Sequence, residues 1–108
     1  MKQGDVCWYT FREPDKRRPV VVLTRNSAIP YLTSLTVAPI TSTIRNVPSE
    51  VLHTPGEDGL LQECVVNAHN LQTVHKDRIG ELLTQLSIER LREVRSAIEF
   101  ALGLDELG

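Results

Sequence analysis

Residues 19–24 read Pro-Val-Val-Val-Leu-Thr, a short apolar run of the length of a β-strand. Because no polar residue alternates with the valines, this run is expected to be buried on both of its faces. Pro19 suits the first position of such a strand, where its missing N–H costs the sheet least. The run therefore predicts a strand inside the protein rather than on its surface.

Other runs of β-branched, aromatic or apolar residues flank this strand. They predict further extended segments at residues 5–11, 32–42, 50–53, 60–66, 71–74 and 79–86. With residues 19–24 these are seven segments, of which 71–74 and 79–86 are short extended pieces, so the predicted architecture has about six short strands. Turn signals separate them, with the strongest at residues 55–59. Pro39 should bend its strand or place that strand at an edge. Many short strands separated by turns favour a small closed β-barrel.

The last part of the chain changes to the period of a helix. The Ser87 hydroxyl can cap its first turn, and Gly103 suits the left-handed residue that ends a helix. The fold predicted is therefore β-rich α+β, with a C-terminal amphipathic helix that packs against the sheet. The apolar residues of this helix recur at intervals of three and four, at Ile88, Leu91, Val94, Ile98, Ala101 and Leu102.

Length and charge indicate one compact domain with an uneven charge distribution. The 108 residues suffice for a single domain, residues 1–108. Residues 1–50 carry seven basic and four acidic groups, whereas residues 51–108 carry five basic and ten acidic groups. The basic half could face a polyanion such as nucleic acid. A core this small would also gain from dimerisation.

The first residues include charged Lys2 and Asp5 and do not resemble a secretory signal. No apolar run has the length of a membrane span, so we expect a cytoplasmic protein without a membrane partner. Cys7 and Cys64 lie far apart without a CxxC motif, which favours two buried or half-buried thiols over a disulfide.

Three histidines raise the question of a metal site. His53, His69 and His75 are separated by sixteen and six positions, which matches no common zinc pattern, and the cysteines do not complete one. The glycines of residues 56–59 lack the Lys-Ser/Thr pair of a phosphate-binding loop. We therefore predict neither a metal nor another cofactor.

Four blocks of the sequence resemble the signature blocks of the MazF/PemK toxins in their order and spacing. They are Gly4-Asp5-Val6-Cys7-Trp8, Arg18-Pro19-Val20-Val21-Val22-Leu23, Ala38-Pro39-Ile40-Thr41-Ser42 and residues 66–80. The resemblance implies an SH3-like barrel, a homodimer, and an endonuclease that cuts single-stranded RNA at short sequences. It also implies neutralisation by a cognate antitoxin, whose disordered tail wraps the dimer.

The resemblance further implies that Arg18 and Thr41 are the catalytic residues. RNA supplies its own nucleophile, the 2′-OH, and its attack on phosphorus develops negative charge on the phosphate oxygens. Without a metal, a fixed cation and hydrogen-bond donors must stabilise that charge. A guanidinium contacts two phosphate oxygens at once, and a threonine hydroxyl can donate to another. Arg17 is the alternative cation, because a shift of one residue along a strand reverses the face.

Further polar residues could contact RNA phosphates or bases. Asn70 lies where the family often has a polar residue near the substrate groove, and Trp8 or Tyr9 could stack a base. Two features depart from the family: the first loop is short and basic, with Glu13 alone at the position of a motif glutamate, and Gln72 replaces a common arginine. The predicted RNA-binding residues are Arg17, Arg25, Asn26, Ser42, Thr43, Arg45 and Asn70.

Two other functions are compatible with the predicted fold. A barrel toxin without catalytic activity could bind and inhibit DNA gyrase, but it would need no pair such as Arg18 and Thr41. An SH3-like interaction module would expose aromatic side chains to proline-rich ligands, and the chain has only five aromatic residues. The sequence therefore favours the ribonuclease.

Overall fold

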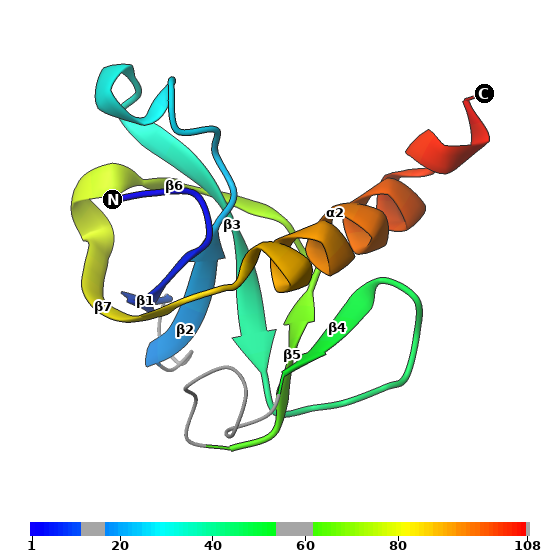
Figure 1. The fold of residues 1–108 in the computed structure, drawn as a ribbon. Coiled ribbons are helices and arrows are strands. Elements are labelled where there is room, and N and C mark those ends of the chain that lie inside the picture. Colours follow the sequence, from blue (N-terminus) through cyan, green and yellow to red (C-terminus); the bar gives the residue numbers. More distant parts are fainter. Residues whose placement is uncertain (12–16, 54–61, 108) are drawn as a thin grey trace.

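The computed structural model describes residues 1–11, 17–53 and 62–107, and these form seven β-strands and one α-helix (Figure 1). The strands are β1 (Asp5–Thr10), β2 (Arg17–Val22), β3 (Ser34–Thr41), β4 (Glu50–His53), β5 (Cys64–Asn67), β6 (Gln72–His75) and β7 (Ile79–Gln85). The helix is α2 (Ile88–Leu102). Three short 3-10 helices are η1 (Ile29–Tyr31), η2 (Lys76–Arg78) and η3 (Leu104–Glu106).

The strands pair antiparallel in the order β4-β5-β3-β2-β1-β7, and β6 pairs with β3 beside β5. β2 thus lies between two neighbours, and its valines at residues 20–22 are 0% exposed. This confirms a buried strand at the valines, although β2 ends at Val22, so that Leu23 and Thr24 of the predicted strand 19–24 lie outside it. β2 begins earlier than predicted, because its first two residues pair with Tyr9 and Thr10 of β1.

The predicted closure of the sheet into a barrel stays a prediction. Across residues 1–11, 17–53 and 62–107, no strand pairing joins β4 to β7, so the sheet follows an open path. The predicted strand 60–66 begins at Cys64, with residues 60 and 61 outside the described residues. The turn signal at residues 55–59 and the first loop, with Glu13, also lie outside them.

Pro39 does not lie in an edge strand, because β3 has neighbours on both sides. On one side, β3 pairs with β6 up to Val37 and with β5 from Ile40 onward. Pro39 therefore falls at the break between these two partners, where a missing N–H costs the sheet least.

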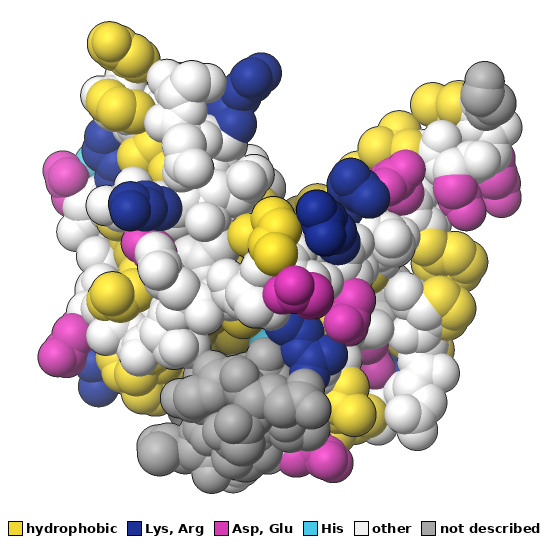
Figure 2. Space-filling view, in the orientation of Figure 1, with side chains coloured by type: hydrophobic (Ala, Val, Ile, Leu, Met, Phe, Trp, Pro, Cys, Tyr) yellow, Lys and Arg dark blue, Asp and Glu magenta, His cyan; other side chains and the backbone are white. Residues whose placement is uncertain are grey.

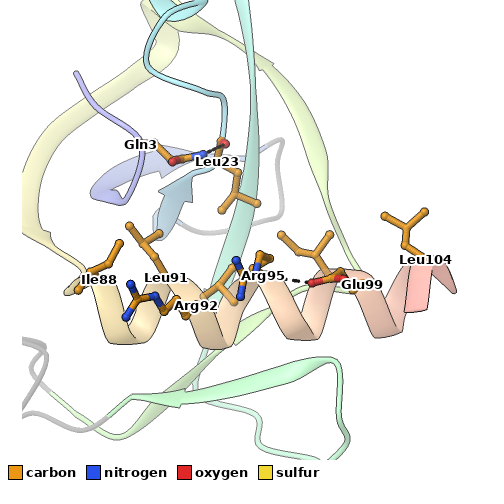
Figure 3. Close-up of a pocket in the computed structure, with 10 residues that line it drawn as sticks. Gln3, Leu23, Ile88, Leu91, Arg92, Arg95, Glu99 and Leu104 are labelled. Atoms are coloured by element: carbon orange, nitrogen blue, oxygen red, sulfur yellow. Dashed lines mark hydrogen bonds and ion pairs between the residues drawn. The ribbon is translucent and has the colours of Figure 1, made fainter. Parts of the chain in front are cut away.

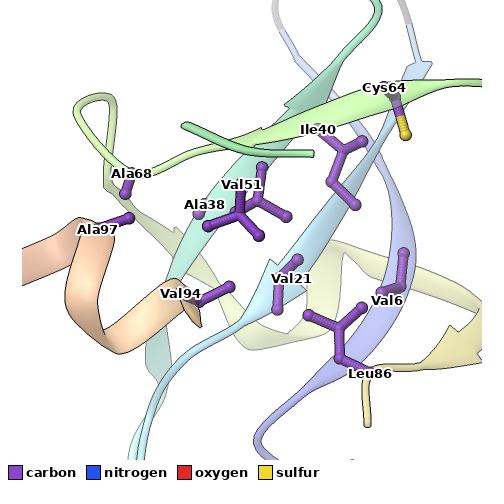
Figure 4. Close-up of a cluster of buried hydrophobic side chains, with 11 residues drawn as sticks. Val6, Val21, Ala38, Ile40, Val51, Cys64, Ala68, Leu86, Val94 and Ala97 are labelled. Carbon is purple, nitrogen blue, oxygen red and sulfur yellow. The ribbon is translucent and has the colours of Figure 1, made fainter. Parts of the chain in front are cut away.

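Side chains alternate along the strands and build two separate hydrophobic clusters. Val21 joins the cluster that packs under α2, together with Val94 and Ala97 of the helix (Figure 4). Val20 and Val22 join the cluster on the opposite side of the sheet. The fold thus needs an apolar residue at each of positions 20–22, because each valine side chain packs into one of the two hydrophobic clusters.

Helix α2 begins and ends where the sequence predicts. The Ser87 hydroxyl accepts a hydrogen bond from the Arg90 N–H at 3.2 Å, and Gly103 closes the helix with a φ of 71°. The apolar face, however, is only partly buried: Ile88 and Leu102 are 56% and 58% exposed. The C-terminal part of α2 projects beyond the sheet, together with η3 (Figure 1).

Replacing Ser87 with alanine should lower the free energy of unfolding by about 1 kcal/mol, because the first turn loses its cap. Urea denaturation of both proteins measures this. Ser96→Ala is the matched control, since Ser96 is exposed within α2 and alanine favours a helix interior there. If Ser87→Ala were as stable as Ser96→Ala, the hydroxyl would not act as a cap.

A groove of about 580 Å³ runs beside α2. Leu23, Leu91, Ile98 and Leu104 give it apolar walls, and Arg92 and Arg95 line it as well (Figure 3). In the space-filling view a hollow opens between the projecting end of the helix and the upper left part of the molecule (Figure 2).

Both predicted thiols are buried. Burial and the neighbouring Asp5 carboxylate raise the pKa of the Cys7 thiol above its ordinary value, so this thiol stays protonated and unreactive. Among the described helices, none is long and apolar enough to cross a membrane.

Candidate active site

Arg18 and Thr41 lie at the same end of the sheet, because β2 begins at Arg17 and the antiparallel β3 ends at Thr41. The register pairs Val20 with Pro39. The pairing of these two strands ends there, and Arg18 and Thr41 each lie two residues beyond it. Since residues two apart on a strand point to the same side, both side chains belong to one face of the sheet. The backbone thus places at one end and on one face of the sheet the two residues that the resemblance implied.

Arg17 and Arg18 point to opposite faces of β2. The Arg17 guanidinium carbon lies 4.4 Å from the centroid of the Trp8 ring, so a cation–π contact restrains this side chain. It also covers the ring on which a base would have to stack. The exposed Arg18 side chain forms no hydrogen bond or ion pair within the described residues. Arg18 is therefore the better placed cation for a ligand.

The half-buried Thr41 has a hydroxyl that is already oriented. Its Oγ1 accepts a hydrogen bond from the Thr43 N–H at 3.2 Å. A hydroxyl that accepts in this way keeps its own hydrogen for donation. The same turn places Ser42 and Thr43, both exposed, directly beside the Arg18 end of the sheet.

The loop that follows is held by a residue that sequence reasoning missed. Oε1 of Glu50 accepts hydrogen bonds from the N–H groups of Arg45, at 2.9 Å, and Asn46, at 3.1 Å. Asn46 has a φ of 57°, a left-handed conformation that asparagine tolerates better than most residues. The sequence offers no signal for this contact, because the two donors are backbone groups.

Three of the predicted RNA-binding residues lie away from this end. Arg25 and Asn26 follow the opposite end of β2, beyond Val22, which strand geometry places roughly 13 Å from Arg18. Asn26 Oδ1 accepts a hydrogen bond from the Gln3 N–H at 2.7 Å. Asn70 lies in the turn between β5 and β6, where it is exposed.

The histidines have separate partners. His53 is fully buried and donates from Nδ1 to the Val51 carbonyl, at 2.9 Å. His69 Nδ1 lies 2.6 Å from Ser49 Oγ, and His75 Nδ1 accepts from the Asp77 N–H. No group of three or more potential metal ligands forms among the described residues.

A family model described as "PemK-like, MazF-like toxin of type II toxin-antitoxin system" matches residues 2–102. The chain belongs to this toxin family. The resemblance found in the sequence blocks is thereby confirmed.

Named relatives agree with this assignment. The toxin is 39% identical over 99 residues to the "Probable endoribonuclease MazF5" of Mycobacterium tuberculosis, a match that covers 92% of this chain and 90% of the relative. It is 40% identical over 91 residues to "Endoribonuclease MazF3" of the same species, covering 84% and 87%. Both relatives are named as endoribonucleases, which favours ribonuclease activity over gyrase inhibition.

Solved structures share the fold. "Mycobacterium tuberculosis toxin MazF-mt6" superposes with a TM-score of 0.83 at 34% identity, covering 92% of the toxin and 96% of that chain. An "Endoribonuclease in complex with its cognate antitoxin from Mycobacterial species" superposes with a TM-score of 0.85 at 25% identity, covering 96% of both chains.

Proposed function

We propose that this toxin is a sequence-selective endoribonuclease that cleaves single-stranded RNA without a metal. The observation that carries the proposal is the position of Arg18 and Thr41 at one end and on one face of the sheet. A guanidinium without a polar partner among residues 1–11, 17–53 and 62–107, and an oriented hydroxyl on the same face, form a site for a phosphodiester. The family and the endoribonuclease names of the relatives support the same activity.

In the proposed mechanism, the 2′-OH of one nucleotide attacks the adjacent phosphorus, and the bond from phosphorus to the 5′ oxygen breaks. The guanidinium of Arg18 stabilises the charge of the phosphorane and protonates the departing 5′ oxygen, while Thr41 donates to a non-bridging oxygen. Water accepts the proton that the 2′-OH loses, and the neutral guanidine of Arg18 takes a proton back from water, so that the enzyme is unchanged at the end of the reaction. The products are a 2′,3′-cyclic phosphate and a 5′-OH.

The remaining RNA contacts divide by position. Ser42, Thr43 and Arg45 belong to the end of the sheet that holds Arg18, or to the loop that follows it, and would contact nucleotides near the cut. Arg17 lies at the same end but on the opposite face of β2, so it would contact RNA only away from the cleaved bond. Arg25, Asn26 and Asn70 lie farther away. They would therefore bind nucleotides that flank the cleaved one.

The proposal extends to the assembly and its surroundings. The whole chain would be one domain with a closed SH3-like barrel, acting as a homodimer in the cytoplasm and neutralised by a cognate antitoxin. Exposed apolar residues support further protein contacts, since Phe100, Leu102 and Leu107 are 50%, 58% and 78% exposed. The antitoxin complex among the similar structures supports the antitoxin partner.

Cleavage should persist in excess EDTA, because the proposed charge stabilisation comes from Arg18 and Thr41. The test incubates the toxin with a long single-stranded RNA and maps the ends that form. We expect 2′,3′-cyclic phosphate and 5′-OH ends at unchanged rate. Activity that vanished in EDTA and returned with added Mg²⁺ would contradict the mechanism.

A further inference from the structure

Tyr9 is an aromatic side chain beside Arg18 that the proposed mechanism does not use. The register of β1 and β2 pairs Tyr9 with Arg18. Residues that oppose each other in this way lie on one face of the sheet, with Cβ atoms about 5 Å apart. Because β2 lies between β1 and β3, Tyr9 and Thr41 come from the two strands that flank Arg18. Tyr9 therefore belongs to the face and to the end of the sheet that carry the proposed cleavage site.

The ring of Tyr9 is held in place from within the protein. It packs against the hydrophobic cluster that contains Val20 and Val22, and it meets the Phe11 ring edge to face, with centroids 4.8 Å apart and planes at 72°. Tyr9 and Phe11 are only half-buried, so part of this aromatic pair is open to solvent. An aromatic ring that is already restrained loses little conformational freedom when a ligand covers it.

The other three aromatic residues lie elsewhere. Trp8 faces the other side of the sheet and is covered by the Arg17 guanidinium. Tyr31 is 86% exposed but lies in η1, beyond the far end of β2. Phe100 lies in helix α2. The ring that a bound RNA would meet beside the cleavage site is therefore that of Tyr9.

This arrangement suits one nucleotide of a single strand. A phosphodiester held by Arg18 has a ribose and a base on each side, and Tyr9 lies one strand, about 4.8 Å, away from Arg18. Proteins that bind single-stranded nucleic acids combine cations that contact the backbone with aromatic rings on which bases stack. Every base has a flat face, so stacking tolerates any sequence. In a duplex the neighbouring bases cover both faces of each base, so only an unpaired base can use the ring.

We propose that Tyr9 binds one unpaired base next to the cleaved bond by stacking, whatever that base is. The contact strengthens the binding of single-stranded RNA and disfavours double-stranded RNA, because a base must leave its helix to reach the ring. Tyr9 is a binding residue in this proposal and takes no part in proton transfer or charge stabilisation. This inference rests on the proposed ribonuclease function.

The test measures the affinity of the toxin for single-stranded RNA oligonucleotides whose attacking nucleotide is 2′-deoxy, so that they are not cleaved. The base is removed in turn from each nucleotide near the cut. At one position the abasic nucleotide should raise Kd about tenfold, the effect of losing one stacked base. A phenyl ring in place of that base stacks but forms no hydrogen bonds, so it should restore most of the affinity.

Variants assign this effect to Tyr9. Tyr9→Leu should raise Kd about tenfold for the intact RNA, and the abasic nucleotide should then cause no further loss, because ring and base act as a pair. Tyr9→Phe keeps the ring and should bind like the unmodified toxin. In both variants kcat should stay within a few-fold, because stacking contributes equally to the bound state and to the transition state. Tyr31→Leu is the matched control, since it removes an exposed tyrosine at the far end of the sheet and should change neither constant.

The possible outcomes separate the two proposals. If no abasic position weakens binding by the unmodified toxin, or if the phenyl ring restores nothing, no base stacks at the site, and this result needs no folded variant. If the losses from Tyr9→Leu and from the abasic nucleotide add, the base stacks on another residue. A fall in kcat with unchanged Kd would show that Tyr9 positions Arg18 and would also overturn the inference. If the unmodified toxin neither binds nor cleaves RNA, the ribonuclease proposal itself fails.

Discussion

Replacing Arg18 with alanine should reduce the rate of RNA cleavage about 10³-fold or more while leaving the fold intact. The guanidinium is the charge that the proposed mechanism places against the phosphorane, and the loss of even one such donor costs about 10²–10³ in rate. Its side chain is exposed at the start of β2, so its removal leaves no cavity in either core. Cleavage rates at saturating RNA, together with thermal melting, measure both effects.

Arg17→Ala is the matched control for this prediction. Arg17 precedes Arg18 on the same strand but faces the other side and stacks on Trp8. Its removal should weaken RNA binding or stability slightly and reduce the rate less than tenfold, because a single exposed contact contributes about 1 kcal/mol. The assignment would be reversed if Arg17→Ala were inactive and Arg18→Ala active.

Replacing Thr41 with valine should slow cleavage roughly tenfold to a hundredfold. Valine keeps the shape and the β-branch but removes the hydroxyl, so a charge-stabilising donor worth about 1–3 kcal/mol is lost. The effect should fall on kcat rather than on KM, since the hydrogen bond strengthens as charge develops. Single-turnover and steady-state kinetics on one RNA oligonucleotide separate the two constants.

Thr41→Ser separates chemistry from loop structure. Serine keeps both the donor and the acceptor of the Thr43 N–H bond, so activity should stay within a few-fold of the unmodified toxin. Were Thr41→Ser as slow as Thr41→Val, the methyl group and the packing it provides would account for the loss, and the hydroxyl would have no role in the reaction.

Much of the fold could be predicted from local sequence patterns. The valine run predicted a buried strand, because a strand with one face in solvent would place a polar residue between apolar ones. The helix was delimited at both ends, since Ser87 and Gly103 satisfy backbone groups in ways that few residues can. The break at Pro39 was not predictable, because it depends on which two strands share one side of β3.

The candidate site was likewise only partly predictable from the sequence. Sequence blocks indicated Arg18 and Thr41, but only the antiparallel pairing of β2 and β3 places the two residues at the same end of the sheet. The Arg17 contact with Trp8 likewise depends on strand pairing rather than on sequence order. Glu50 was missed because its partners are main-chain groups of a loop, and these leave no pattern in the residue types.

The groove along α2 lies on the side of the sheet that the helix covers, whereas Thr41 and Glu50 face the other side. If RNA is cut at Arg18 and Thr41 as proposed, a protein bound in that groove alone would contact the opposite side of the sheet and leave the cleavage site accessible. Such a complex would still cleave RNA. Complete inhibition of cleavage therefore requires an inhibitor that extends around the edge of the sheet, or a second contact that covers the face with Thr41 and Glu50.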